Sequence, residues 1–116
     1  MTVITVFVPT FSYAADLGIV VARFGSCDYF IADGPNGLYV LEWYGGYYPD
    51  EGDQIYGEIG SYGMVDVFYP DQSLEGSVWV EDFWESKSGA IDEIRDHCWF
   101  VIMLKIYWII KFAILP

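Results

Sequence analysis

The sequence predicts a mainly β protein of the α+β class, a small antiparallel barrel or curled sheet of five or six strands with one C-terminal helix. Between residues 37 and 69, three apolar runs alternate with period two, and Gly-rich or acidic segments separate them. Aromatic residues make up 20% of the chain, which suits strands. A chain of 116 residues has the length of one domain.

Six strands are expected along the chain, each bounded by turn residues. The segment from Asp33 to Gly37 contains Gly, Pro and Asn, and its Asn-Gly pair favours a tight hairpin, so the second and third strands should pair. The expected strands are Leu17–Phe24, Asp28–Ala32, Leu38–Tyr44, Asp53–Ile59, Met64–Tyr69 and Ser77–Trp84.

The last strand and the following helix each have apolar faces. Alternation gives the strand two faces that both carry aromatic side chains: Val78, Val80 and Trp84 on one, and Trp79, Glu81 and Phe83 on the other. Ser86 or Ser88 is the expected helix cap. Ile91, Ile94 and Cys98 follow at spacings of three and four and predict one stripe that packs on the sheet.

The N-terminal residues 1–14 have the pattern of a secretory signal peptide. The apolar run Thr2–Val8 precedes the small residues Ser12 and Ala14, which predicts cleavage after Ala14. No Lys or Arg precedes Arg23, so the charged part of such a signal is missing. The alternative is a first strand within residues 3–8.

The C-terminal residues Trp99–Pro116 form an apolar run without acids, outside the acidic domain of residues 15–98. As a helix these 18 residues would extend about 27 Å, just short of a ~30 Å hydrocarbon core. Lys105 lies inside the run and weakens it as an anchor. Three interpretations stay open: a marginal membrane anchor, a core element, or a non-native extension.

The two cysteines, Cys27 and Cys98, are predicted to form a disulfide if the chain is exported to an oxidising compartment. Two free thiols are the alternative. Together with the signal-peptide pattern, the disulfide predicts a periplasmic or secreted location. If Trp99–Pro116 is a membrane anchor, the protein is also attached to a membrane.

The charge is concentrated in one segment. All 17 acidic residues lie between Asp16 and Asp96, whereas residues 15–98 contain three basic residues, which gives this segment a net charge of −14. Such a surface repels nucleic acid and attracts cationic partners. A basic protein or a small ligand is therefore the expected partner, and nucleic acid is not; the alternative is that the charge serves solubility alone.

A cluster of aromatic and acidic residues in and after the third strand is the predicted binding site. Ring faces stack on sugars or hold cations, and loops carry function more often than strands do. The residues are Trp43, Tyr44, Tyr47, Tyr48, Asp50, Glu51 and Asp53. The alternative is ordinary core packing beside a Tyr-rich loop. The three acids do not have the spacing of an EF-hand, so a solvated acidic turn is expected, with no metal and no cofactor.

The segment from Gly52 to Ile59 resembles the Gly-Asp turn and following strand of OB-fold barrels. The resemblance implies a small β-barrel that, in that family, binds nucleic acid through a basic groove and stacking aromatics. This chain has the aromatics but is acidic, so nucleic-acid binding is not expected. The resemblance identifies no binding residue.

The expected function is a small secreted or envelope-associated binding module with an acidic, Tyr-rich surface. His97 is the single histidine and is expected at the surface, and no catalytic motif is present, so an enzyme is not predicted. One alternative is an inhibitor or immunity-type protein that neutralises a basic enzyme or toxin. Another is a structural, membrane-associated protein without its own ligand.

Overall fold

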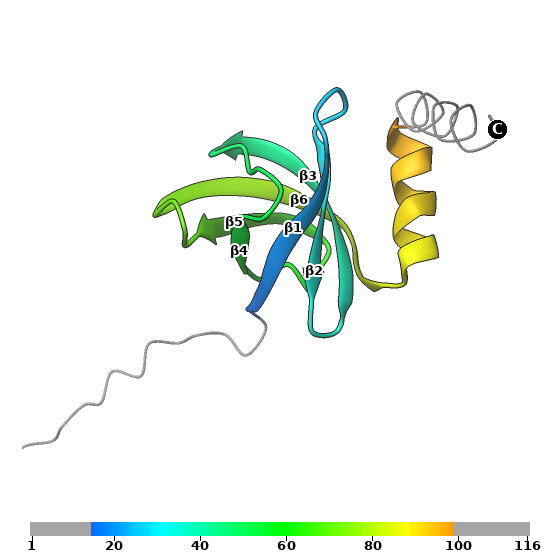
Figure 1. Ribbon diagram of the computed structural model, residues 1–116, viewed down its shortest axis with the longest axis horizontal. Helices are drawn as coiled ribbons and strands as arrows, with labels where there is room; N and C mark the ends of the chain where they lie inside the picture. Colours follow the sequence, from blue (N-terminus) through cyan, green and yellow to red (C-terminus); the bar gives the residue numbers. More distant parts are fainter. Residues whose placement is uncertain (1–14, 99–116) are drawn as a thin grey trace, which may run out of the picture.

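The computed structural model describes residues 15–98, which form a closed six-stranded antiparallel barrel with a helix beside it (Figure 1). The strand order is β1-β2-β3-β6-β5-β4, and β1 pairs with β4 to close the barrel. The helix covers residues 87–98. The strands are β1 (Asp16–Phe24), β2 (Tyr29–Gly34), β3 (Gly37–Gly46), β4 (Gln54–Gly57), β5 (Gly63–Tyr69) and β6 (Leu74–Glu85). This confirms the predicted fold class. The predicted signal peptide and C-terminal tail lie outside the described residues.

The predicted hairpin between β2 and β3 is present. Its loop consists of Pro35 and Asn36, and the flanking Gly34 and Gly37 pair with each other. Gly37 has a φ of 135°, and a Cβ atom there would lie 2.7 Å from the carbonyl carbon of Trp84. Glycine is therefore required at position 37, both for the backbone conformation and for the close approach of β6.

Apolar side chains pack on both faces of β2 and β3. Phe30, Ala32, Tyr39 and Leu41 belong to the core inside the barrel. A second core lies between the outer face of these strands and the helix, and its buried residues are Tyr29, Ile31, Val40, Ala90, Ile94 and Cys98. The two cores explain why residues 29–32 of β2 are buried without alternation.

The buried stripe of the helix differs by one residue from the prediction. Ala90, Ile94 and Cys98 are buried at spacings of four, whereas Ile91 is 37% exposed. Placing Ile91 on the packed face was wrong, because a neighbouring helical residue points about 100° away. The helix is capped by Ser86, whose Oγ accepts a 3.1 Å hydrogen bond from the N–H of Gly89.

The end of β6 also departs from the predicted alternation. Val78 and Val80 are buried together on one face, but Phe83 packs against the barrel core and Trp84 is half exposed. The predicted faces of Phe83 and Trp84 were therefore wrong. Trp84 has a φ of 53°, and the pairing of β3 with β6 shifts register between Leu38 and Val40. An irregularity of this kind exchanges the two faces of a strand.

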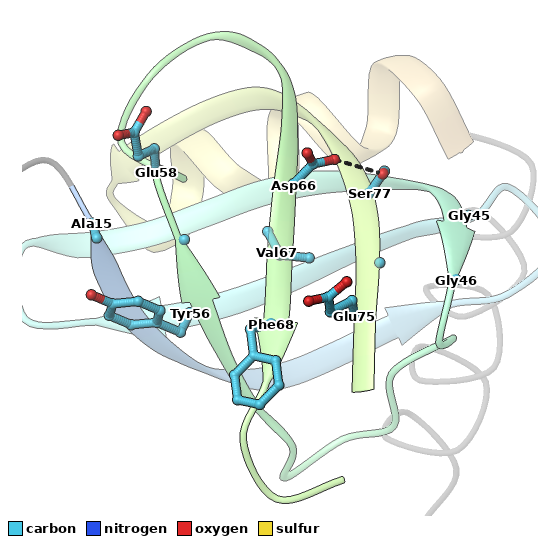
Figure 2. Close-up of a pocket in the computed structure, with 12 residues that line it drawn as sticks. Ala15, Gly45, Gly46, Tyr56, Glu58, Asp66, Val67, Phe68, Glu75 and Ser77 are labelled. Carbon is cyan, nitrogen blue, oxygen red and sulfur yellow. Dashed lines mark hydrogen bonds between the residues drawn. The ribbon is translucent and has the colours of Figure 1, made fainter. Parts of the chain in front are cut away.

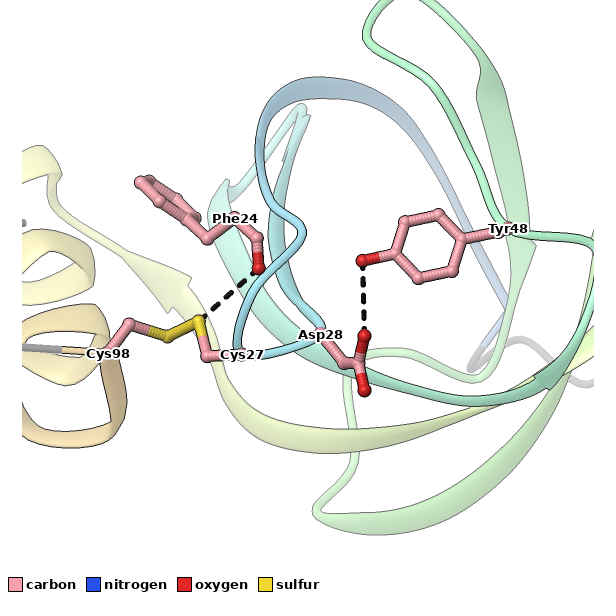
Figure 3. Close-up of a disulfide and its surroundings, with 5 residues drawn as sticks. All are labelled: Phe24, Cys27, Asp28, Tyr48 and Cys98. Carbon is pink, nitrogen blue, oxygen red and sulfur yellow. Dashed lines mark hydrogen bonds between the residues drawn. A yellow bond between two sulfur atoms is a disulfide. The ribbon is translucent and has the colours of Figure 1, made fainter. Parts of the chain in front are cut away.

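The predicted disulfide joins Cys27 in the β1–β2 turn to Cys98 in the helix (Figure 3). The two Cα atoms lie 5.7 Å apart. The bridge therefore ties the helix to the barrel beside the second core.

Candidate functional site

The loop between β3 and β4, where binding residues were predicted, is held by hydrogen bonds within the chain. The Tyr47 hydroxyl donates to Asp53 Oδ2 across 2.7 Å, and the N–H of Asp50 donates to the same oxygen across 2.9 Å. Burial alone would raise the pKa of Asp53, but the hydrogen bonds from Tyr47, Asp50 and Gln72 hold that pKa below its usual value. The hydrogen bond to Asp53, together with burial, raises the pKa of Tyr47 to about 12.

Arg23 in β1 extends this network. Its guanidinium lies 4.1 Å from the centre of the Tyr48 ring and pairs with Asp50 at 2.5 Å. The Tyr48 hydroxyl donates to Asp28 across 3.4 Å (Figure 3), and its ring packs on Trp43 with centroids 5.0 Å apart. These contacts fasten the loop to β1 and to the β1–β2 turn.

The structure thus brings most of the predicted binding residues together, but as partners of one another. Trp43, Tyr47, Tyr48, Asp50 and Asp53 belong to the network. Tyr44 and Glu51 are exposed beside it. The carboxylates of Asp50 and Asp53 already accept hydrogen bonds from donors of this chain. We therefore interpret the loop mainly as a structural element that is fastened to the barrel.

A pocket of about 650 Å³ lies on the barrel surface, between residues of β4, β5, β6 and the end of β3 (Figure 2). Its lining includes four glycines, Gly45, Gly46, Gly57 and Gly76. A Cβ atom at Gly57 would lie 2.9 Å from the Asp66 carbonyl oxygen, and one at Gly76 would lie 2.8 Å from that of Gly45. Glycine lets the neighbouring strands approach at these points and leaves the pocket without side chains there.

Three carboxylates and two aromatic rings surround this pocket, which we call the acidic groove. The carboxylates are those of Glu58, Asp66 and Glu75, and the rings those of Tyr56 and Phe68 (Figure 2). All residues that line the groove in the described part of the chain are acidic or uncharged. Such a surface suits a cationic side chain, which gains both from the carboxylates and from the ring faces.

Asp66 and Phe68, both on β5, contribute different contacts to the groove. Asp66 Oδ1 accepts a 3.1 Å hydrogen bond from the hydroxyl of Ser77 on β6. Phe68 is 39% exposed and stands opposite Glu75 in the β5–β6 pairing. An apolar surface thus lies directly beside a carboxylate at the groove.

These groove residues were not among the predicted binding residues. A signal was present, because Met64, Asp66 and Phe68 alternate on the exposed face of β5. The groove, however, joins residues from four strands, and only the strand order and register bring them together.

A second cluster lies between β6 and the helix. The Nε2 atom of His97 is 2.9 Å from Glu81 Oε1 and 3.9 Å from Glu93 Oε2. The His97 ring stacks on the buried Tyr29 ring, with centroids 4.8 Å apart and planes 16° apart. Burial first, and then the charges of Asp82 and Glu81, raise the pKa of Glu93. In the sequence, only the spacing of four residues between Glu93 and His97 on a helix indicates that two of these side chains lie close together.

Comparisons with known proteins give no relative from which residues can be transferred. No protein-family model matches the chain, and neither the curated proteins nor the solved structures compared with it give a match. The resemblance of Gly52–Ile59 to OB-fold barrels stays a prediction; the barrel has six strands, whereas that family has five. Within residues 15–98, no helix is long and apolar enough to cross a membrane.

Proposed function

We propose that this chain is a small extracytoplasmic binding module that recognises a cationic segment of a partner protein at the acidic groove. The observation that carries the proposal is the lining of the groove, where the carboxylates of Glu58, Asp66 and Glu75 occur together with the rings of Tyr56 and Phe68. Arginine and lysine side chains pair with carboxylates through their charged ends and pack their methylene stems against aromatic surface.

The charge of the whole domain supports the same partner. With a net charge of −14 over residues 15–98, the domain attracts cationic proteins from a distance and accelerates their encounter with it. The Cys27–Cys98 disulfide supports a location outside the reducing cytoplasm. Neutralisation of a basic enzyme or toxin is the form of this function that the charge favours most.

The loop between β3 and β4 supports recognition indirectly. Asp50 pairs with Arg23, and Asp53 accepts from Tyr47 and from the backbone of Asp50, so these two acids offer a partner less than the groove carboxylates do. We therefore assign the loop the task of fastening itself to β1 and to the β1–β2 turn.

The test measures binding of a short Arg- and Lys-rich peptide by fluorescence anisotropy. The groove variant carries Glu58→Gln, Asp66→Asn and Glu75→Gln. The matched control carries Asp33→Asn, Asp92→Asn and Asp96→Asn, three exposed acids away from the groove, so both variants lose the same charge. We expect the groove variant to bind about tenfold more weakly than the control, since three exposed ion pairs at roughly 0.5 kcal/mol each together contribute about 1.5 kcal/mol.

Salt provides the second measurement. Screening shortens the reach of charges to about 8 Å at physiological ionic strength, so peptide binding should weaken steeply as salt is added. Equal losses in the two variants would show that the peptide responds to net charge alone and would reject the groove as the site. Binding that is insensitive to salt would reject a cationic partner.

A further inference from the structure

We propose that Glu81, Glu93 and His97 form a binding site for a divalent transition-metal ion of the zinc class, which would bridge the helix and β6. One ligand atom from each residue lies within 4.8 Å of the others. The site is separate from the acidic groove, and its residues come from the other end of β6 and from the helix.

The distances are close to those that tetrahedral zinc requires. Zinc bonds to nitrogen and carboxylate oxygen are about 2.0–2.2 Å long, so two ligand atoms of a tetrahedral site lie about 3.4 Å apart. The distances from His97 Nε2 to Glu81 and Glu93, 2.9 and 3.9 Å, lie on either side of that value. Small side-chain rotations are therefore enough to coordinate an ion.

Packing holds the ligands before any ion arrives. His97 and Glu93 lie one turn apart on one face of the helix, and the disulfide at Cys98 fixes that turn to the barrel. The Tyr29 ring stacks on the His97 ring and so restricts its rotation. Fixed ligands lose little freedom on binding, which favours affinity.

Charge and access also favour a cation. Two carboxylates face one imidazole, and Asp82 and Asp96 add negative charge around Glu93. Arg95 on the same helix pairs with Asp92. The side chains of Glu81, Glu93 and His97 are 24%, 34% and 35% exposed, so an ion reaches them from solvent and leaves a coordination position for water.

The ligand types select the ion. An imidazole nitrogen with carboxylates suits Zn²⁺ and its neighbours, whereas Ca²⁺ takes six to eight oxygen ligands and Mg²⁺ prefers oxygen as well. Calcium and magnesium should therefore compete poorly for this site.

The test is calorimetric titration of the intact, tag-free chain with Zn²⁺, together with thermal unfolding. We expect one equivalent to bind, to raise the unfolding temperature, and to resist displacement by excess Ca²⁺. His97→Gln, Glu93→Gln and Glu81→Gln should each weaken binding by at least about tenfold, because losing even a residue that only supports a ligand costs about 10–100-fold.

Two control variants separate this site from general attraction to acids. Asp33→Asn removes an exposed carboxylate from β2, and Asp92→Asn removes one from the same helix; both should retain the affinity. Several weak equivalents that persist in the His97→Gln variant would mean diffuse binding to the acidic surface and would overturn the proposal. Failure of the wild-type chain to bind Zn²⁺ would overturn it as well.

Discussion

The indole N–H of Trp84 donates a hydrogen bond to the carboxylate of Asp16 across 3.1 Å, although the two residues are 68 positions apart. Asp16 begins β1 and Trp84 lies near the end of β6. The hydroxyl of the buried Tyr39 donates to the same carboxylate oxygen. One acid thus joins the start of the first strand to the third strand and the last.

Replacement of Asp16 by Ala should destabilise the barrel by about 2 kcal/mol, because the buried Tyr39 hydroxyl loses its acceptor. Urea unfolding measures the change. Asp33→Ala, at an exposed position on β2, is the matched control and should change stability by less than about 0.5 kcal/mol. Equal effects of the two substitutions would contradict a special role for Asp16.

Alkaline pH should unfold the protein through its buried tyrosines. Burial, followed by the hydrogen bond to Asp16, raises the pKa of Tyr39 to about 12, from an ordinary value of 10.0. Below pH 10 this tyrosine is protonated in both states. Between about pH 10 and 12 the unfolded chain loses its proton more readily than the folded chain does, so stability falls as pH rises.

The measurement is the free energy of unfolding at several pH values in this window. Tyr39→Phe removes one of the groups responsible, so its curve should fall less steeply with pH than that of the wild type, whatever its stability at neutral pH. An unchanged slope would show that Tyr39 does not contribute.

Replacement of Tyr69 by Phe should stabilise the protein by about 1 kcal/mol. Tyr69 is fully buried, and its hydroxyl has no hydrogen-bond partner among the described residues. Phe keeps the ring, which meets the Tyr47 ring edge-on at 5.1 Å, and removes the unsatisfied oxygen. Thermal unfolding is the measurement; a lower unfolding temperature would show that the hydroxyl has a partner such as a buried water.

Reduction of the disulfide should lower the free energy of unfolding by about 4 kcal/mol, because the bridge closes a loop between residues separated by 71 positions. The barrel core contains neither cysteine, so the reduced protein should keep its strand signal in circular dichroism while the helix loosens. Urea unfolding with and without reductant measures the loss. Replacing both Cys27 and Cys98 by Ser in one variant is the control, and reductant should leave its stability unchanged.

Much of the barrel was predictable from local patterns. Apolar runs bounded by turn residues located all six strands, and the turn around Asn36 predicted the β2–β3 hairpin. β4 proved shorter than predicted, Gln54–Gly57 instead of Asp53–Ile59, because the chain bends at Glu58 and turns at Ile59. Alternation failed at Phe83 and Trp84, where the irregular pairing with β3 exchanges the faces of β6.

The candidate sites were less predictable. Aromatic and acidic composition directed attention to the loop of residues 43–53, and the structure shows most of those side chains bonded to one another. The acidic groove and the Glu81–Glu93–His97 cluster each combine residues from separate elements. Sequence spacing connects only Glu93 with His97, since they share a helix.

The sequence by itself therefore determined the strands, the helix and the acidic charge, because each follows from composition or from the pattern of neighbouring residues. Only the tertiary structure decided how the barrel closes, where Ala90 replaces Ile91 against the sheet, and which carboxylates meet Phe68 or His97. These features depend on register between distant strands, and a shift of one residue in register turns every side chain of a strand to the opposite face.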